Sequence, residues 1–174
     1  ALTRFTLNGF NSLMILDKNQ CKPLDQDRQG LNLGEGAAYV LLLNKKALTF
    51  LGLSSSVVVS GYSNSNDSYH QTALSDDGQG PFLAMQGAIK KANILPGQID
   101  YINMHGTGTQ NNDQAESQAV KNLFQDNIPP LSSTKSFTGH TLGASGAVEA
   151  VISVLAIQHH FIPPNYHFNS SIEP

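Results

Sequence analysis

The sequence predicts a layered α/β fold, in which helices pack against a sheet. Short apolar or β-branched segments alternate with segments of helical periodicity, and turns that contain Gly or Pro separate them. Along the chain the order is strand, helix, strand, helix, strand, helix, which is typical of this fold class. Hydrophobic residues make up 40% of the 174 positions, so the chain can bury a core.

The N-terminal part of the chain predicts one helix and two strands. Residues 2–16 carry a weak apolar stripe at helical spacing, and a turn-rich stretch follows at 17–36. The continuous apolar run AAYVLLL at 37–43 has the length of a strand. Residues 54–63 are rich in β-branched side chains and predict a second strand.

The central part of the chain alternates helices with short strands. A helix is expected over 82–92, because Pro81 suits a first helical turn and two lysines lie near the C-terminal end. Segment 99–104 predicts a strand, and Asn112 opens a further helix. Segment 131–134 predicts another short strand.

The last predicted helix, 143–158, is apolar nearly all round, which predicts a buried helix. Among its few polar side chains, Ser145, Glu149 and Ser153 are four residues apart and therefore share one face. A carboxylate in such a helix is rarely unpaired. Lys135 is the nearby cation in the sequence and is the candidate partner of Glu149.

Composition and charge exclude several classes of protein. The formal net charge is −3 and no basic run stands out, which disfavours nucleic-acid binding. We find no stretch of about 18 apolar residues, so we expect no membrane span. Cys21 is the single cysteine, which rules out an internal disulfide and favours a cytoplasmic setting. Charged residues amount to only 13%, and neither end resembles a natural boundary, so we interpret the chain as part of a longer polypeptide.

Two histidines lie in segments that suit catalysis. His105 opens the segment HGTGT, and His140 closes the segment KSFTGH. Each follows a predicted strand and lies in a glycine-containing turn that leads to a helix. In α/β sheets, ligands bind in the crevice beyond the carboxyl ends of the strands. Glycine allows the backbone to approach a substrate closely, and threonine hydroxyls can bind a ligand or orient an imidazole.

These segments resemble the motifs of β-ketoacyl synthases. HGTGT at 105–109 resembles the first histidine motif of that family, and STKSFTGHTLGASGAVE at 133–149 closely resembles the second. Residues 21–43 are similar to the stretch that leads into the last strand of the family's N-terminal half. Residues 100–116 match its strand, motif and following helix. A single HGTGT would be weak evidence, but the ordered set covers nearly the whole chain.

The resemblance implies a fold and a reaction. The fold would be thiolase-like, built from two similar halves, with residues 1–52 ending the N-terminal half. Residues 53–174 would form the C-terminal ketosynthase domain, truncated before its last strands. The reaction would be a decarboxylative Claisen condensation of an acyl thioester with a malonyl thioester, in fatty-acid or polyketide synthesis. Acyl carrier protein would be one partner, and a second ketosynthase chain would complete a homodimer or heterodimer.

The resemblance also assigns roles to individual residues. His105 and His140 match the pair that faces the malonyl thioester and stabilises enolate charge on its oxygen. Either imidazole could also act as a base, and the sequence does not decide which. Lys135 matches the lysine near the second histidine and is grouped with the catalytic residues. Glu149 matches its acidic partner and supports it.

Substrate and cofactor expectations follow from the same match. Thr107 and Thr109 match the threonines that contact the phosphopantetheine arm of the substrate carrier. No cofactor of the enzyme's own is expected, and His105 and His140 lack further ligands for a metal site. Cys21 is not the family's nucleophile, which falls before the first residue of this chain. We therefore predict that the isolated chain is inactive.

Several alternatives remain beside this interpretation. The chain could belong to a non-catalytic ketosynthase-like subunit, a chain-length factor, although the retention of both histidines argues against it. A degradative thiolase is disfavoured, because such enzymes commonly use a second cysteine. Asp113 and Glu116 fall in the first turn of a predicted helix, where acids suit the helix dipole. That effect accounts for Asp113, and a role in a polar network is the alternative for Glu116.

Overall fold

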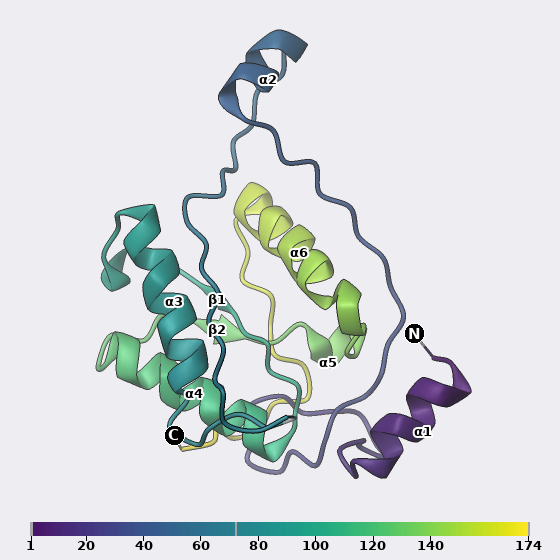
Figure 1. Ribbon diagram of the computed structural model, residues 1–174. Helices are drawn as coiled ribbons and strands as arrows, with labels where there is room; N and C mark the ends of the chain where they lie inside the picture. Colours follow the sequence, from purple (N-terminus) through teal and green to yellow (C-terminus); the bar gives the residue numbers. More distant parts are fainter. Residues whose placement is uncertain (1, 72, 174) are drawn as a thin grey trace.

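The computed structural model describes residues 2–71 and 73–173, and it has an α/β architecture (Figure 1). Two short strands, β1 (Ile102–Asn103) and β2 (Leu131–Ser132), form a parallel pair in which Ile102 lies opposite Leu131. Helices lie on both sides of this pair, with α3 and α4 on one side and α6 on the other (Figure 1). The layered fold predicted from the sequence is therefore present.

Helices α3 (Gln79–Ala92) and α4 (Gln110–Phe124) pack against each other and against one face of the strands. Both begin a few residues before the predicted positions. The buried cluster between them contains Leu24, Met104, Val120 and Phe124, with six partly buried neighbours, namely Met85, Ile89, Ile99, Ile102, Leu123 and Leu131. Since successive strand residues point to opposite faces, Ile102 joins this core while Asn103 points toward α6.

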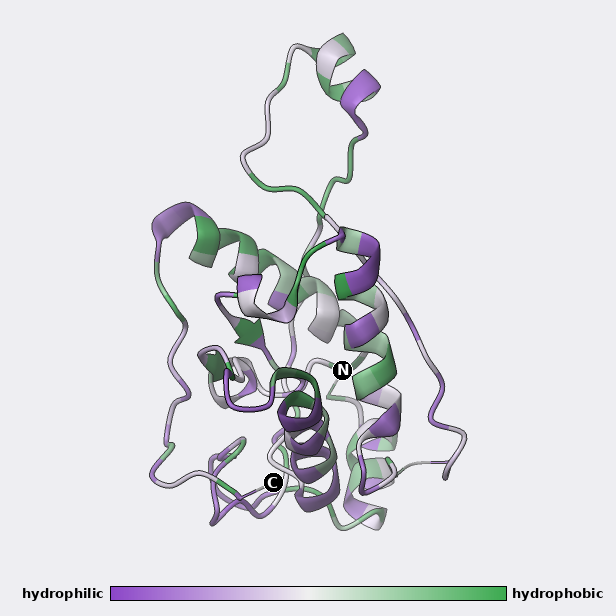
Figure 2. Ribbon diagram, turned by 90° about the vertical axis from the view of Figure 1, so that its left-hand side faces the viewer, coloured by the Kyte–Doolittle hydropathy of each residue, from purple (hydrophilic) through white to green (hydrophobic). Residues whose placement is uncertain are grey.

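The apolar helix α6 (Ser145–His159) follows the four-residue helix α5 (Lys135–Thr138) and the 3₁₀ helix η2 (Leu142–Ala144). Its existence was predicted correctly, but its burial was not. Only Ser145 and Ala156 are buried in this chain, and Ile157 is 55% exposed. Figure 2 shows that much of the helix is nevertheless hydrophobic. An apolar helix needs a neighbour on each side, and the described residues cover one side only.

Among the described residues, one segment is long and apolar enough to cross a membrane by length and composition, which corrects the expectation that the sequence contains no such stretch. It is Leu142–His159, and 11% of it is buried in this chain. The core helix of a soluble protein passes the same test, so this observation is weak evidence for a span. Glu149 lies near the middle of the segment and pairs with the buried Lys135. A charged pair at this position is expensive in a bilayer and suits a protein interior.

The two strands predicted in the N-terminal part are wrong for this chain. Residues 37–43 and 54–63 are extended but form no ladder with any described segment. They flank α2 (Lys45–Leu51), and the parts next to α2 project with it from the body (Figure 1), whereas Gly61 packs against α3. Apolar side chains such as Tyr39, which is 94% exposed, face solvent. The local preference for a strand is unchanged, but a strand forms only when a partner satisfies its backbone.

The remaining helices are short and peripheral. Helix α1 (Arg4–Ser12) falls inside the predicted range 2–16 and has no buried residue. Thr3 caps it, since the Thr3 hydroxyl accepts a hydrogen bond from the Thr6 amide at 3.2 Å. The 3₁₀ helix η1 (Pro96–Gln98) connects α3 to β1. Neither element contributes a residue to the candidate site.

Asp25 connects the C-terminal segment around residues 169–170 to the N-terminal part of the chain through hydrogen bonds. Its fully buried carboxylate accepts hydrogen bonds from the backbone amides of Asn169 (2.6 Å), Ser170 (3.1 Å) and Asp27 (2.8 Å). Burial alone would raise the pKa of Asp25, but these three donors outweigh it and lower the pKa below its ordinary value. The charged form is therefore favoured in the folded chain.

We expect Asp25→Asn to lower the free energy of unfolding by about 2–3 kcal/mol at pH 7. The side-chain NH₂ group of the asparagine would face backbone N–H groups, and two donors cannot form a hydrogen bond with each other. The exposed Asp27→Asn is the matched control and should change stability by less than about 0.5 kcal/mol. Urea unfolding of the natural polypeptide that carries this sequence measures both. Since the pKa of Asp25 is lowered, its contribution is complete above the unfolded value of 3.8 and is lost as pH falls. Equal stability of the two variants at pH 7 would contradict this role.

Candidate active site

The first histidine loop requires glycine at two positions. His105 directly follows β1, and Gly106 and Gly108 have φ angles of 37° and 86°. A Cβ atom at Gly106 would lie 2.5 Å from the side chain of Ser133, and one at Gly108 would lie 2.5 Å from the carbonyl oxygen of Gly30. The loop therefore folds tightly against both the second half of the site and the N-terminal segment.

Asp113 holds this loop through hydrogen bonds to its backbone. The helix dipole alone, which the sequence predicted as the explanation of Asp113, is therefore not sufficient. Its side chain is fully buried in the first turn of α4. It accepts hydrogen bonds from the backbone amides of Thr107 (2.9 Å), Gly108 (3.1 Å) and Leu24 (2.7 Å). One carboxylate thus fixes the HGTGT loop and joins it to a segment about 90 residues earlier in the chain.

Arg28 adds a cation to the same junction. The side chain is 5% exposed, and its Nε atom lies 3.8 Å from the Asp113 carboxylate. The guanidinium donates to the carbonyl oxygens of Thr109 (3.3 Å) and Gln110 (3.1 Å). Burial lowers the pKa of Arg28, while Asp113 and Asp25 act in the opposite direction. Because these partners satisfy the buried charge, the end of the loop has a fixed position.

Glu116 holds the two residues at the start of the loop. Its carboxylate oxygens accept hydrogen bonds from the backbone amides of His105 (2.7 Å) and Gly106 (2.8 Å). Burial raises the pKa of Glu116 to about 7, against the opposing effect of these two donors. The network role that the sequence left open for Glu116 is therefore the one the structure shows.

The second histidine is held by the backbone of an N-terminal segment. The His140 amide donates to the carbonyl oxygen of Asn32 at 2.7 Å, and the Gly34 amide donates to the carbonyl oxygen of His140 at 3.1 Å. The approach is so close that a Cβ atom at Gly34 would lie 2.0 Å from the Thr138 carbonyl oxygen. Gly139, with a φ angle of 65°, allows the chain to turn here.

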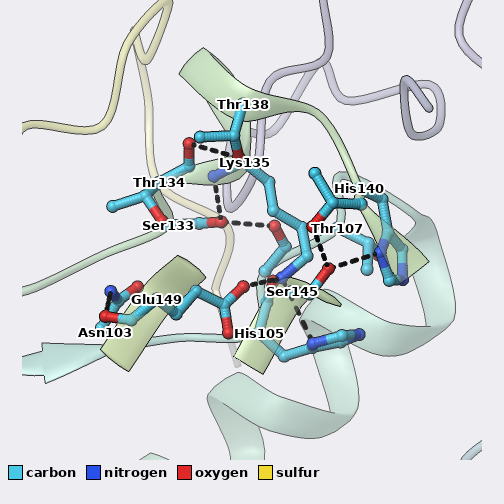
Figure 3. A network of polar contacts seen from close by, with 12 residues as sticks. Asn103, His105, Thr107, Ser133, Thr134, Lys135, Thr138, His140, Ser145 and Glu149 are labelled. Atoms are coloured by element: carbon cyan, nitrogen blue, oxygen red, sulfur yellow. Dashed lines mark hydrogen bonds and ion pairs between the residues drawn. The ribbon is translucent and has the colours of Figure 1, made fainter. Parts of the chain in front are cut away.

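Lys135 joins the two histidine loops (Figure 3). Its side chain is almost fully buried, and its Nζ atom pairs with the Glu149 carboxylate. The same atom donates to the His105 carbonyl oxygen at 2.6 Å and lies 3.3 Å from His105 Nδ1. An ammonium group has three hydrogens, and these three acceptors engage all of them. The predicted pairing of Lys135 with Glu149 is present in the structure.

This contact fixes the tautomer of His105. An ammonium group can only donate, so His105 Nδ1 is the acceptor and the ring proton lies on Nε2. Burial of the ring, the charge of Lys135 and the neighbouring His140 lower the pKa of His105 to about 4. Because the residue as a whole remains exposed, solvent screens part of this effect, but its direction keeps the imidazole neutral near pH 7.

His140 has the same tautomer for a different reason. Its Nδ1 atom accepts a hydrogen bond from the backbone amide of Leu142 at 3.1 Å, so the proton again lies on Nε2. Burial and the charge of Lys135 lower the pKa of His140. The rings of His105 and His140 are 5.2 Å apart and almost perpendicular, at 84°. Both lie on the same side of Lys135 (Figure 3).

The arrangement suits the stabilisation of negative charge on a substrate oxygen. Two neutral imidazoles each present an Nε2–H donor, and a buried ammonium lies behind them. Donors whose orientation is fixed before reaction need no reorganisation when charge develops, which makes them effective catalysts. A neutral imidazole that donates through Nε2 does not act as a base through that nitrogen. The geometry therefore favours electrostatic stabilisation over proton abstraction.

The predicted substrate contacts lie beside the histidines. The hydroxyls of Thr107 and Thr109 are 2.9 Å apart, and Thr107 is buried. Thr109 borders a cavity of about 450 Å³ that Leu74 and Asn111 also line. Thr109 is therefore the better placed of the two threonines to contact a ligand. The structure brings His105, Lys135, His140 and Glu149 together. Thr107 and Thr109 belong to the same loop as His105, and their side chains contact each other.

Cys21 is buried next to the backbone of Lys135. Its side chain is 2% exposed, and its sulfur lies 3.5 Å from the Lys135 carbonyl oxygen. Burial raises the pKa of the thiol, which makes the thiolate scarce. Cys21 thus packs beneath the site and lacks the properties of a nucleophile. Within 2–71 and 73–173, no three His, Cys, Asp or Glu side chains are grouped to hold a metal ion.

We predict that Glu116→Gln removes a pH dependence of stability. Because burial raises the pKa of Glu116 from 4.5 to about 7, the folded chain binds this proton more tightly than the unfolded chain. Its contribution to the free energy of unfolding therefore falls as pH rises through this window, by at most about 3 kcal/mol. Urea unfolding at pH 4.5 and pH 7 gives the free energy of unfolding of the natural polypeptide and of the variant. We expect the value for the natural polypeptide to fall relative to that of the variant between pH 4.5 and pH 7. A relative rise over this range would refute the prediction.

Comparison with known proteins finds a matching family model and similar sequences. The family model for the C-terminal domain of β-ketoacyl synthases matches residues 56–169. A 3-oxoacyl-[acyl-carrier-protein] synthase 2 of Rhizobium meliloti (strain 1021) is 40% identical over 182 residues, covering 99% of this chain and 43% of the relative. The protein of the same name from Staphylococcus aureus is 36% identical over 173 residues, covering 95% of this chain and 43% of the relative.

Solved structures show the same fold. The ishigamide ketosynthase/chain length factor superposes with a TM-score of 0.93 at 34% identity, covering 98% of this chain and 42% of that chain. A ketosynthase in complex with its chain length factor from Xenorhabdus doucetiae gives a TM-score of 0.82 at 37% identity, covering 99% and 41%. The expected thiolase-like α/β fold is confirmed.

The chain spans less than half the length of the curated relatives it matches, 43% for the two named above. The matched C-terminal domain nevertheless covers more than half of the chain. The resemblance drawn from the two histidine motifs is thereby confirmed, and the chain belongs to the β-ketoacyl synthase family.

Proposed function

We propose that this chain supplies the malonyl side of the active site of a condensing enzyme. The observation that carries the proposal is the pair of neutral imidazoles, His105 and His140, each fixed as an Nε2–H donor beside the buried Lys135. A thioester carbonyl oxygen bound by both donors would be stabilised as it gains negative charge. The names of the relatives, 3-oxoacyl-[acyl-carrier-protein] synthases, agree with this chemistry.

The reaction would proceed in balanced steps. The bond between the malonyl α-carbon and its carboxylate breaks, CO₂ leaves, and the electron pair delocalises onto the thioester oxygen as an enolate. His105 and His140 stabilise that oxygen. The α-carbon then attacks an acyl group held as a thioester on a cysteine, and the cysteine leaves as a thiolate. Cys21 is buried and is not that cysteine.

The substrates would reach the site on a carrier. We propose that Thr107 and Thr109 contact the phosphopantetheine arm of acyl carrier protein, which would make a cofactor of the enzyme's own unnecessary. One solved structure at 29% identity and TM-score 0.92 is a type II polyketide ketosynthase in complex with its acyl-carrier protein.

The organisation proposed for the whole protein is that of a paired ketosynthase. Residues 1–52 would complete an N-terminal half and residues 53–174 would form most of a C-terminal half. A homodimer, or a heterodimer with a ketosynthase-like partner, is the proposed assembly, and a cytoplasmic location the proposed setting. The exposed apolar surface of α6, of 37–43 and of 54–63 supports an assembly larger than this chain.

A chain-length factor is the second candidate function. It is favoured by two structural neighbours whose descriptions include a chain length factor. A non-catalytic subunit has no need for imidazoles fixed in a reactive tautomer, yet both histidines are so fixed here. We therefore place the enzyme first. A condensation assay with acyl- and malonyl-acyl carrier protein, applied to the natural polypeptide, separates the two functions.

We expect His105→Ala and His140→Ala each to lower the rate of malonyl-CoA decarboxylation by about 10²- to 10³-fold, because each removes one donor to the enolate oxygen. His159→Ala is the matched control, since His159 is exposed at the far end of α6 and touches no site residue. Release of CO₂ by the natural polypeptide and its variants provides the measurement. A wild-type protein without decarboxylation, or histidine variants as active as the control, would overturn the proposal.

We further predict that the isolated 174-residue chain does not catalyse condensation. Within the described residues, the single cysteine is buried and has a raised pKa, so no thiol can accept the acyl group. Incubation of the purified chain with acyl- and malonyl-acyl carrier protein should yield no 3-oxoacyl product by mass spectrometry. Turnover by this chain alone would refute the prediction.

A further inference from the structure

We propose that Thr141 and Ser145 are positioning residues, which hold His140 in the tautomer that carries its proton on Nε2. The inference rests on the proposed function, because it explains how one of the two donors stays ready for the substrate. Neither hydroxyl was assigned a role by the sequence motifs. The contacts that carry the proposal are a short chain of two buried hydroxyl groups that ends on the imidazole.

The direction of this chain follows from the donors available. His140 Nδ1 accepts from the Leu142 amide, so it has no proton to give. Ser145 Oγ lies 3.0 Å from the same Nδ1 and must therefore be the donor. Thr141 Oγ1 lies 3.2 Å from Ser145 Oγ and can donate to the free lone pairs of that oxygen. The hydrogen bonds thus run from the Thr141 hydroxyl to the Ser145 hydroxyl and from there to His140 Nδ1. We call this pair of hydroxyl groups the relay.

Burial makes these contacts significant. Thr141 is 5% exposed and Ser145 is 6% exposed. A buried hydroxyl that loses its partner costs free energy, so the two groups stay paired while His140 presents an acceptor. Protonation of His140 at Nδ1 would set its N–H against the Leu142 amide hydrogen. The surrounding donors therefore select one tautomer.

The usual role of a serine at a helix start does not explain Ser145. A serine that caps a helix precedes the first turn and accepts a hydrogen bond from a backbone amide. Ser145 is instead the first residue of α6, and its cap residue, Ala144, makes no side-chain bond. The hydroxyl of Ser145 contacts His140 and Thr141 only. The helix leaves its own end uncapped while this hydroxyl contacts the imidazole.

Leu142 adopts a backbone conformation that residues other than glycine seldom have. Its φ angle is 56°. Such a conformation carries a cost and persists where the surrounding structure requires it. Here the turn brings the Leu142 amide and the Ser145 hydroxyl onto the same nitrogen of His140. The strain lies at Leu142, whose amide is one of the two donors that set the tautomer.

The two histidines thus receive the same tautomer from different partners. An ammonium donates to His105 Nδ1, whereas an amide and a neutral hydroxyl donate to His140 Nδ1. The charged or titratable groups that face His140 are Lys135 and the ring of His105. A hydrogen bond to the unprotonated nitrogen stabilises the neutral ring, so its loss should raise the pKa of His140.

The test uses Ser145→Ala and Thr141→Val in the natural polypeptide labelled with ¹⁵N-histidine. Ring ¹⁵N shifts report the tautomer and the pKa of His140 without any substrate. We expect Ser145→Ala to raise this pKa by about half a unit to one unit and to increase the Nδ1–H population. Decarboxylation of malonyl-CoA should lose about tenfold in kcat with KM within about twofold, since one hydrogen bond is lost. Thr141→Val should shift the signals in the same direction by less.

Two further variants separate the relay from packing. Thr141→Ser keeps the hydroxyl but removes the methyl group that faces Gly36, so it should restore the wild-type ring signals that Thr141→Val loses. Ser153→Ala removes a hydroxyl of α6 that bonds to the Glu149 carbonyl at 2.8 Å, and it should leave the His140 signals unchanged. If Thr141→Ser perturbs His140 as strongly as Thr141→Val, packing is responsible and the relay is refuted.

The ring signals and the activity fail independently. If the wild-type protein does not decarboxylate malonyl-CoA but Ser145→Ala still shifts the His140 tautomer, the relay stands and the proposed function falls. If the protein is active and Ser145→Ala leaves the tautomer and pKa of His140 as in the wild type, the relay falls and the proposed function stands. The Thr141 pair gives the same information if Ser145→Ala does not fold.

Discussion

The buried ammonium of Lys135 is the interaction on which the rest of the site depends. A charge removed from water must be compensated, and here Glu149 of α6 together with two atoms of His105 provide all the compensation. Those partners belong to a loop after β1 and to a helix that starts ten residues after Lys135. The requirement to satisfy one ammonium therefore brings three separate elements together. The orientation of His105 follows from it, because the ammonium can only donate.

Around this centre, the N-terminal segment acts as a frame for both histidine loops. Asp113 and Arg28 connect the HGTGT loop to residues 24–28, and the backbone of residues 32–34 pairs with His140. Most of these bonds involve main-chain atoms on at least one side. Side-chain identity in the frame is therefore constrained at a few positions, such as Gly34, where an added Cβ atom has no room. The pair of imidazoles is rigid because backbone from three regions holds it.

The sequence predicted the elements whose evidence is local and missed those whose partners are remote. Helices α3, α4 and α6 were found because the apolar pattern that predicts a helix lies within each segment. Strands at 37–43 and 54–63 failed, because a strand needs a neighbour that the described residues do not supply. The site residues came from motif resemblance, whereas Asp113 and Arg28 were missed because their contacts cross about 80–90 positions. A signal existed for Asp113 and Glu116, which lie three apart on one helical face directly after a glycine turn that needs acceptors.

The pairing of Asn32 with His140 has a consequence for synthesis on the ribosome. The two residues are separated by about 108 positions, and translation at roughly 5–20 residues per second spans that interval in about 5–20 s. During this time residues 32–34 have been synthesised, but their partner His140 has not. Loop closure over such distances is slow compared with helix formation. The pairing that holds His140 therefore forms only after the second histidine loop has been synthesised, and until then the backbone of residues 32–34 lacks this partner.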